Sequence, residues 1–329
     1  MKVIDDSNGV IPEEVLIALQ EEWYAGSKKN EDRFASVTML MMPPKMFWGI
    51  KKHESGQHEI TASRSLYSLE GHINHYFFER VFGPLEDFKE EFEVKVNYHI
   101  DGRQFVLTGH SDLVNTRSKT LVDWKNLNVG KYQKGEFGEF ETQTNMYAYF
   151  INGMNQKGFV DFQIENIKII GKLRDWSAME LIKKTKNYPK YMFVAFKLNM
   201  WSPNTAKAYI DNRLRTLLYY ENYDLDQIPE CSPEERWQKE TTYPVFNCNK
   251  DGEVKEKARA CSGTANFKSP EQGEKWIEDR IRADKIKKKS NFYTIKKRSS
   301  FPTRCAGYCD VSRNGLCNWW NEHRSEYGC

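Results

Sequence analysis

Hydrophobic and polar residues alternate along neighbouring stretches in the first half of the chain. Residues 91–100 and 104–108 both follow the two-residue period of a strand, and Asp101-Gly102 between them is typical of a tight hairpin turn. Residues 109–125, GHSDLVNTRSKTLVDWK, predict two more short strands joined by a polar turn. The pattern therefore predicts at least three adjacent strands.

Helical spacing of apolar residues surrounds these strands. Residues 66–82 carry apolar side chains on two faces: Leu66, Ile73 and Phe77 on one, and Phe78 and Phe82, with His75, on the other. We expect such a helix to be buried, with His75 inside the protein. Further helices are predicted at about residues 12–24, 135–150, 178–186 and 205–221, together with a short helix that Ser36 would cap. Further strands are predicted at residues 160–173 and 191–200.

The composition of the chain changes near residue 224, where it becomes rich in polar residues, Pro, Cys and Lys. With 329 residues, the chain is at or beyond the usual size of a single core. We therefore predict a core domain over residues 1–223 and an appended module over residues 224–329.

Charge and hydropathy limit the classes of function only weakly. A net charge of +3 gives no general affinity for nucleic acid, so a local basic patch would have to provide it. The chain has 17 Tyr, 19 Phe and 9 Trp, which is enough to build a core and excludes global disorder. No apolar run approaches the roughly 18 residues of a membrane span. We expect no membrane partner and a cytoplasmic location, in the host cell if the protein is encoded by a phage.

Four short motifs follow one another between residues 71 and 147. They are Gly71-x3-His75-x3-Glu79 on a predicted helix, Gly109-x2-Asp112 and Asp123-x-Lys125 on predicted strands, and Gln143-x3-Tyr147 on a second helix. Each motif alone has an ordinary structural explanation, such as a core histidine, a turn or a polar helix face. Their order, spacing and placement together favour a catalytic centre.

The residue types in these motifs suit metal-dependent phosphodiester hydrolysis. Asp112 and Asp123 provide hard oxygen ligands for Mg²⁺ or Mn²⁺, the backbone carbonyl of Trp124 is a further candidate, and His75 favours manganese. Lys125 would orient water and stabilise negative charge in the transition state. A glutamate of the preceding strand, Glu91 or Glu93, could also reach the site, and the sequence does not choose between them.

The four motifs resemble those of the RecB-like branch of the PD-(D/E)xK nuclease superfamily, which includes phage exonucleases and CRISPR-associated iron–sulfur exonucleases. GHINHYFFE, GHSDLV, DWK and QTNMY match its histidine, GxxD, (D/E)xK and QxxxY motifs, with Asp123 where many relatives have Glu. The resemblance implies an α/β (α+β) restriction-endonuclease-like fold, a mixed central sheet flanked by helices. It also implies metal-dependent cleavage from DNA ends, with Gln143 and Tyr147 contacting DNA near the cleaved phosphate.

All seven cysteines lie at or after Cys231, and three of them form the run Cys305-x3-Cys309-x7-Cys317. Three thiolates need a fourth ligand to hold a zinc ion or a [4Fe–4S] cluster. Spacing leaves Cys231, Cys248, Cys261 and Cys329 open as the fourth. The resemblance of CSPEERW to the opening of the C-terminal half in phage relatives favours Cys231, and a [4Fe–4S] cluster is favoured over Zn²⁺. Relatives with a cluster usually place one cysteine before the nuclease core, and this chain has none there.

A basic stretch near residue 290 is a candidate DNA-binding surface. Its residues are Lys285, Lys287, Lys288, Lys289, Lys296, Lys297 and Arg298, which bracket Asn291-Phe292-Tyr293. Cations with interleaved aromatic rings suit phosphate neutralisation and base stacking, although a solvated surface explains the charge equally well.

The sequence therefore predicts a divalent-metal-dependent DNA exonuclease, plausibly phage-encoded, acting in recombination, replication or repair. Its expected partners are DNA ends, single- or double-stranded, a single-strand annealing or recombination protein, and further copies of itself. The alternatives are an inactive, structural DNA-binding protein that keeps this fold, and a zinc-based adaptor built on the cysteine module.

Overall fold

The computed structural model describes residues 2–26, 33–53, 59–183, 187–249, 253–254, 260–262, 267–282 and 292–328. The chain forms two compact units, Met1–Met42 with His53–Tyr219, and Pro43–Lys52 with Tyr220–Cys329. The division after Tyr219 lies close to the predicted boundary at residue 223. The pattern did not predict that the short segment Pro43–Lys52 belongs with the C-terminal unit.

The first unit is built on a mixed six-stranded sheet of order β2-β5-β6-β7-β8, with β4 also paired to β5. The strands are β2 (Ala35–Ser36), β4 (Phe88–Ile100), β5 (Arg103–Asn115), β6 (Thr120–Leu127), β7 (Asn166–Leu173) and β8 (Phe193–Lys197). The pairs β2–β5 and β6–β7 are parallel, and β4–β5, β5–β6 and β7–β8 are antiparallel. The expected mixed sheet flanked by helices is confirmed.

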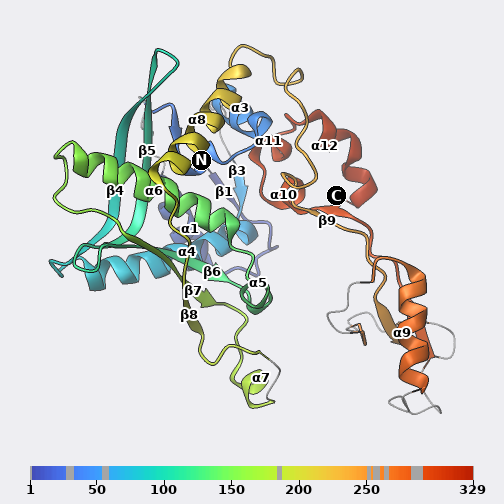
Figure 1. Cartoon of the computed structure of the whole chain (residues 1–329). Helices are drawn as coiled ribbons and strands as arrows, with labels where there is room; N and C mark the ends of the chain where they lie inside the picture. The colour runs from blue at the N-terminus through green and yellow to red at the C-terminus, as the bar shows by residue number, and fades with distance from the viewer. Residues whose placement is uncertain are drawn as a thin grey trace. The chain divides into compact units, whose positions relative to one another are not determined.

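Helices lie on both faces of this sheet (Figure 1). The helices of the unit are α1 (Glu13–Gly26), α2 (Val37–Leu40), α4 (Ala62–Phe82), α5 (Val129–Lys134), α6 (Gly138–Gln156), α7 (Ala178–Ile182) and α8 (Pro203–Tyr219). Phe78 of α4 stacks on Trp124 of β6. The ammonium of Lys125, the next residue of β6, lies over the ring of Phe140 in α6. Because successive strand residues point to opposite faces, α4 and α6 lie on opposite sides of β6. Strands β1 (Lys2–Ile4) and β3 (Glu59–Thr61) form a separate parallel pair.

The predicted hairpin is confirmed. Strands β4 and β5 are joined by Asp101 and Gly102, whose φ angles are 50° and 75°. Positive φ at both central positions is the requirement of the hairpin turn that matches the twist of two strands. The strand β5 is longer than predicted and continuous through the GxxD motif, so Asp112 lies near its end and not at its start. Strands β7 and β8 are shorter than the predicted strands at 160–173 and 191–200.

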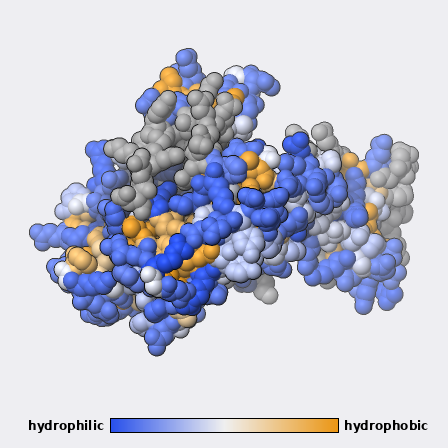
Figure 2. Space-filling model, turned by 90° about the horizontal axis from the view of Figure 1, so that it is seen from above, coloured by the Kyte–Doolittle hydropathy of each residue, from blue (hydrophilic) through white to orange (hydrophobic). Residues whose placement is uncertain are grey.

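The prediction that α4 is buried on two faces is wrong. Ile73 and Phe77 are 58% and 59% exposed, and Leu66 is 37% exposed. The helix packs on the sheet through its other face, where Phe78 stacks on Trp124 and Phe82 contacts Phe88. The apolar residues on its outer face therefore remain on the surface of the described part of this unit. Figure 2 shows that hydrophobic residues gather in separate patches on a largely hydrophilic surface.

The second unit combines short helices with two small antiparallel sheets. Its strands are β9 (Gln238–Lys239), β10 (Val245–Cys248), β11 (Phe292–Ile295) and β12 (Phe301–Pro302), and its helices are α3 (Pro44–Lys52), α9 (Pro270–Arg282), α10 (Thr303–Gly307), α11 (Asp310–Arg313), α12 (Asn318–His323) and the 3₁₀ turn η1 (Arg324–Tyr327). Strand β10 pairs with β11, and β9 with β12. Gly49 of α3 packs so closely on Val311 of α11 that a Cβ there would lie 2.5 Å from Cγ2 of Val311. This packing explains why α3 belongs to the unit. In the described part of the chain, no helix combines the length and the apolar character that a membrane crossing requires.

Candidate active site

The site begins where the two central strands separate. Strands β5 and β6 pair from Leu113 opposite Val122 to Asn115 opposite Thr120. Beyond Leu113 the side chain of Asp112 replaces the ladder, because its Oδ2 accepts a 2.6 Å hydrogen bond from the backbone N–H of Trp124. This bond fixes the carboxylate between the strands. The role of the Trp124 carbonyl as a metal ligand stays a prediction.

The pairing of β5 with its other neighbour, β4, is also interrupted at Asp112. The ladder between β4 and β5 is continuous except at Glu91, which would lie opposite Asp112. Glu91 has a φ of 41°, a left-handed conformation that is unfavourable for any residue with a Cβ. Strain of this kind is often found at functional sites. The strained backbone of Glu91 goes together with a carboxylate that lies close to that of Asp112.

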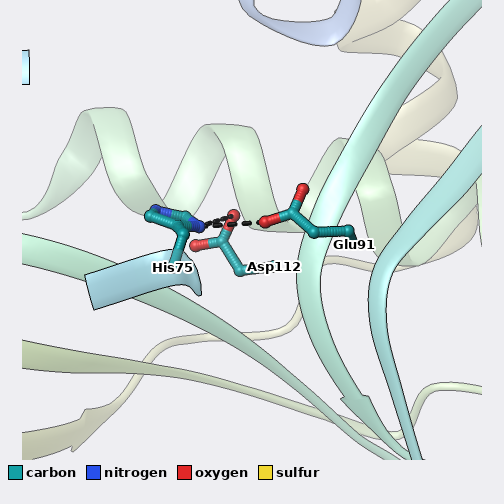
Figure 3. A group of neighbouring side chains, drawn as sticks. All are labelled: His75, Glu91 and Asp112. Atoms are coloured by element: carbon teal, nitrogen blue, oxygen red, sulfur yellow. Dashed lines mark hydrogen bonds and ion pairs between the residues drawn. The ribbon is translucent and has the colours of Figure 1, made fainter. Parts of the chain in front are cut away.

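His75 of α4 completes a group of possible metal ligands (Figure 3). Its Nδ1 lies 3.0 Å from Oε1 of Glu91 and 3.9 Å from Oδ1 of Asp112. One ligand atom from each of the three residues lies within 4.8 Å of the other two. The side chain of His75 is 33% exposed. The prediction that it lies inside the protein is therefore wrong, because the side chain is only half-buried. An imidazole with two carboxylates suits Mn²⁺ or Mg²⁺.

The three side chains shift the pKa values of one another or of their neighbours. The hydrogen bond with Glu91 raises the pKa of His75 despite partial burial, and the charge of Asp112 raises it further. Burial, followed by repulsion from Asp123, raises the pKa of Asp112 to about 7. The raised pKa favours the positively charged form of the imidazole beside Glu91 and Asp112. A divalent cation would take its place.

Asp123 and Lys125 form a buried ion pair beside these residues. Nζ of Lys125 lies 2.7 Å from Oδ2 of Asp123, and their side chains are 22% and 5% exposed. Apart from this ion pair, the buried Oδ2 has no hydrogen-bond partner among the described residues. Burial raises the pKa of Asp123. Burial alone would lower the pKa of Lys125, but the charges of Asp123 and Asp112 outweigh it and raise that pKa. The lysine therefore stays charged, and a poorly satisfied carboxylate oxygen is available to a cation.

Tyr147 supports the site from behind. Its side chain is buried, 5% exposed, and it packs on Gly109 of β5. A Cβ at Gly109 would lie 2.7 Å from Cε1 of Tyr147, so only glycine allows this approach. Burial raises the pKa of Tyr147, and its phenol also bonds to Gln143 and to the backbone of His110. The buried ring holds β5 in position through its contact with Gly109. Contact of Gln143 and Tyr147 with DNA stays a prediction. Gln143 is half-buried.

Glu91 is the candidate site residue that the sequence left undecided. Glu91 and Glu93 are two residues apart on a predicted strand, and alternation places them on the same face. In the structure Glu93 stays in the ladder opposite His110, whereas Glu91 leaves it and turns to His75. No signal in the sequence marks that change of backbone conformation.

The cysteines form a second candidate metal centre, in the C-terminal unit. Cys231, Cys305, Cys309 and Cys317 line one pocket together with Lys45, Arg236, Arg304 and Ser312. Burial, followed by the charges of Glu235 and the other three thiols, raises the pKa of Cys231 to about 12. Burial also raises the pKa of Cys305 to about 11. These two thiols therefore stay protonated at neutral pH unless a cation binds them.

The arrangement of these thiols bears on which metal they suit. A tetrahedral zinc ion with bonds of about 2.3 Å places its thiolates about 3.8 Å apart. Among the described residues, no three of these thiols belong to a set of ligand atoms within 4.8 Å of one another. The buried hydroxyl of Ser312 has no hydrogen-bond partner in the described part of the chain, and the side chain of Arg236 is 15% exposed with its guanidinium over Trp319. Whether this pocket holds a zinc ion or a [4Fe–4S] cluster stays a prediction.

The remaining cysteines lie elsewhere or outside the description. Cys248 is on β10, and Sγ of Cys261 donates to the backbone carbonyl of Val245. Cys329 lies outside the described residues, as do Lys285, Lys287, Lys288, Lys289 and Asn291 of the basic stretch. In the described part of that stretch, Arg298 pairs with Thr242 and lies over the ring of Phe246. DNA binding by this stretch stays a prediction.

Comparison with known proteins gives weak likenesses. No model of a protein family and no curated protein sequence matches the chain. Among solved structures, it is similar to a protein named SSO0001, with 15% sequence identity and a TM-score of 0.45, over 66% of this chain and 89% of the other. It is also similar to a phage-related exonuclease from Haemophilus somnus 129PT, with 14% identity and a TM-score of 0.34, over 54% of this chain and 78% of the other.

Proposed function

We propose that this protein is a divalent-metal-dependent deoxyribonuclease that hydrolyses phosphodiester bonds from DNA ends. One observation carries the proposal: His75, Glu91 and Asp112 converge within 4.8 Å, although they come from three different elements. The buried ion pair of Asp123 and Lys125 lies in the same electrostatic network, since Asp123 and Lys125 both affect the pKa of Asp112. The side chains of Asp112 and Asp123 are only 14% and 5% exposed. Two carboxyl groups buried side by side are unfavourable unless a positive charge or a ligand balances them.

The ligands in this proposal are His75, Glu91, Asp112 and Asp123. A bound Mg²⁺ or Mn²⁺ lowers the pKa of a water molecule and neutralises charge on the phosphate. Neighbouring residues of the protein keep these ligands in position. The N–H of Trp124 fixes Asp112 through its 2.6 Å bond, and the stack of Phe78 on Trp124 fixes the strand.

Lys125 would supply the positive charge next to the reacting phosphate. Its ammonium is held by Asp123 at 2.7 Å, and its raised pKa keeps it protonated at neutral pH. A permanently charged donor stabilises the negative charge that develops on the phosphate oxygens. It acts there as an electrostatic group, since a base would have to lose its proton first.

The second part of the proposal is a [4Fe–4S] cluster held by Cys231, Cys305, Cys309 and Cys317. Support comes from the single pocket that these four residues line. Lys45, Arg236 and Arg304 at the same pocket would offset the negative charge of four thiolates. The cluster would be structural, because it would tie α10, α11 and the turn before α12 to the segment at Cys231.

Digestion of end-labelled linear DNA with Mg²⁺ or Mn²⁺ tests the nuclease proposal. Asp123→Asn and Lys125→Met should each lower the cleavage rate by about 100-fold or more, since each removes one electrostatic contribution to the transition state. Matched controls are Asp101→Asn and Lys183→Met, which change the same residue types in exposed ion pairs. Circular dichroism should show all four variants folded.

Two results would count against the proposal. Full cleavage activity in Asp123→Asn or Lys125→Met would show that the site is elsewhere. DNA binding by the wild-type protein without cleavage in either metal would favour a non-enzymatic DNA-binding protein.

A further inference from the structure

A pocket of about 280 Å³ opens beside the candidate catalytic residues. One wall is α4, with Gly71, Asn74, His75 and Phe78, and the other is formed by three neighbouring strands, with Lys125 and Asn126 of β6, Lys172 of β7 and Phe193 of β8. Because His75 and Lys125 belong both to the pocket and to the catalytic group, a ligand in the pocket lies next to the reacting centre.

The apolar part of this pocket includes three aromatic rings, those of Phe78, Trp124 and Phe193. The rings of Phe78 and Trp124 stack on each other, with their centroids 3.7 Å apart and their planes 5° from parallel, and form a rigid wall. Ile170 extends this surface, and Phe193 lies at the pocket with 47% of its surface exposed. An exposed ring on a strand edge is a typical stacking platform for a base of single-stranded nucleic acid.

The polar part of the pocket has fixed positions. Nδ2 of Asn74 donates to Oδ1 of Asn126 at 3.2 Å, which orients both side-chain amides. Nζ of Lys172 lies 2.9 Å from Oε1 of Glu70, and its side chain is 27% exposed. Amides complement the polar edge of a base, and ammonium groups complement a phosphate. The pocket therefore combines a stacking surface, amides and cations at one place.

The size of the pocket limits what it accepts. Its volume lies at the lower end of the range of ligand pockets, about 300 to 1,000 Å³. That is room for one nucleotide but not for a base pair. A single nucleotide enters such a pocket only after it has left the duplex, which costs least for a base that is already unpaired.

We propose that this pocket binds one unpaired nucleotide of the DNA strand, next to the phosphate that is cut. The proposal rests on the proposed nuclease function and adds the substrate class: a strand with an unpaired end. Blunt duplex ends must first open by one base pair, so they should be cut about tenfold or more slowly than ends with a single-stranded tail.

Fluorescence of 2-aminopurine placed near the end of a single-stranded tail tests this assignment. With the Asp123→Asn protein, which binds without cutting, the fluorescence of one tail position should be quenched by stacking. Adding Phe193→Ala should remove the quenching and weaken binding of tailed DNA about tenfold, as expected for one base–aromatic stack. The matched control is Phe159→Ala, since Phe159 is 73% exposed and lies outside this pocket.

A second variant and a cleavage assay make the outcome decisive. Lys172→Met should weaken the binding of tailed DNA and reduce its salt dependence. The wild-type protein should cut tailed DNA faster than blunt DNA, and Phe193→Ala should remove most of that difference. Equal cleavage of both substrates, with no quenching at any tail position, would overturn the pocket assignment and leave the nuclease function intact. Quenching that depends on Phe193, without cleavage of any DNA, would support the pocket and overturn the nuclease function.

Discussion

Nδ1 of His75 lies 3.0 Å from Oε1 of Glu91, and this contact joins helix α4 to strand β4 at the candidate active site. Glu91 reaches the histidine from a backbone position with a φ of 41°, where the ladder to β5 is interrupted. A left-handed residue with a Cβ is unfavourable by roughly 1–2 kcal/mol. The strained backbone at Glu91 thus goes together with the contact that brings its carboxylate to His75.

Two substitutions at Glu91 distinguish the effect of backbone strain from the effect of losing the carboxylate. Glu91→Ala and Glu91→Gly both remove the ligand, so both should weaken Mn²⁺ binding in isothermal titration calorimetry. Glycine adopts positive φ without strain, whereas alanine does not. Glu91→Gly should therefore have a free energy of unfolding about 1 kcal/mol greater than that of Glu91→Ala, measured by urea denaturation. The same pair at Glu93, which stays in the ladder, should show the opposite order. Equal stability of the two Glu91 variants would show that the backbone there is unstrained.

Removal of metal should make the stability of the protein depend on pH. In the folded state the pKa of Asp112 is raised by burial to about 7, above its ordinary value of 3.8. Between these values the folded protein binds more protons than the unfolded chain, so its stability falls as pH rises from about 4 to about 7. The raised pKa of His75 acts in the same direction at higher pH, because stability present below its ordinary pKa is lost as the folded form deprotonates.

Thermal unfolding in EDTA at a series of pH values checks this expectation. The wild-type melting temperature should decrease with rising pH, and Asp112→Asn should flatten that decrease. Added Mn²⁺ should raise the melting temperature more at high pH than at low pH, since the metal competes with protons. Parallel curves for the wild type and Asp112→Asn would contradict the assignment of the buried acid.

The close packing of Tyr147 on Gly109 predicts that Gly109→Ala is damaging. The added Cβ would meet Cε1 of Tyr147 at 2.7 Å and must displace either the ring or β5, which carries Asp112. We expect a loss of about 1–3 kcal/mol in the free energy of unfolding, together with reduced cleavage. Gly153→Ala is the control, because that glycine lies inside α6 with no atom within 4 Å of the added Cβ, and alanine favours a helix. If Gly109→Ala is as stable and active as Gly153→Ala, the contact has no role.

The cysteine pocket predicts which thiols hold metal. Cys231→Ser should lose most of its iron and its visible absorption, and limited proteolysis should become faster in the C-terminal unit. Cys248→Ser, which changes a half-buried thiol on β10 outside the pocket, should keep the metal content of the wild type. Colourless wild-type protein with one zinc per chain would replace the cluster with a zinc site, and metal loss in Cys248→Ser would change the ligand set.

Local patterns determined much of this protein. The alternation in residues 91–108 and the Asp101-Gly102 turn encode the β4–β5 hairpin, because strand period and positive φ are properties of short segments. The spacing of Asp123 and Lys125 places both side chains on one face of a strand, where they meet at 2.7 Å. Such features depend on few neighbours, so the order of residues suffices to predict them.

Only the tertiary structure decided the features that depend on distant segments. The exposure of Ile73 and Phe77 follows from which face of α4 meets the sheet, and periodicity does not choose between two apolar faces. Cys231 lines the same pocket as Cys305, Cys309 and Cys317 because folding brings residues that are far apart in the sequence together there. The choice of Glu91 over Glu93 depends on a gap in the ladder between β4 and β5. Each outcome is set by packing between residues far apart in the chain, which no local pattern records.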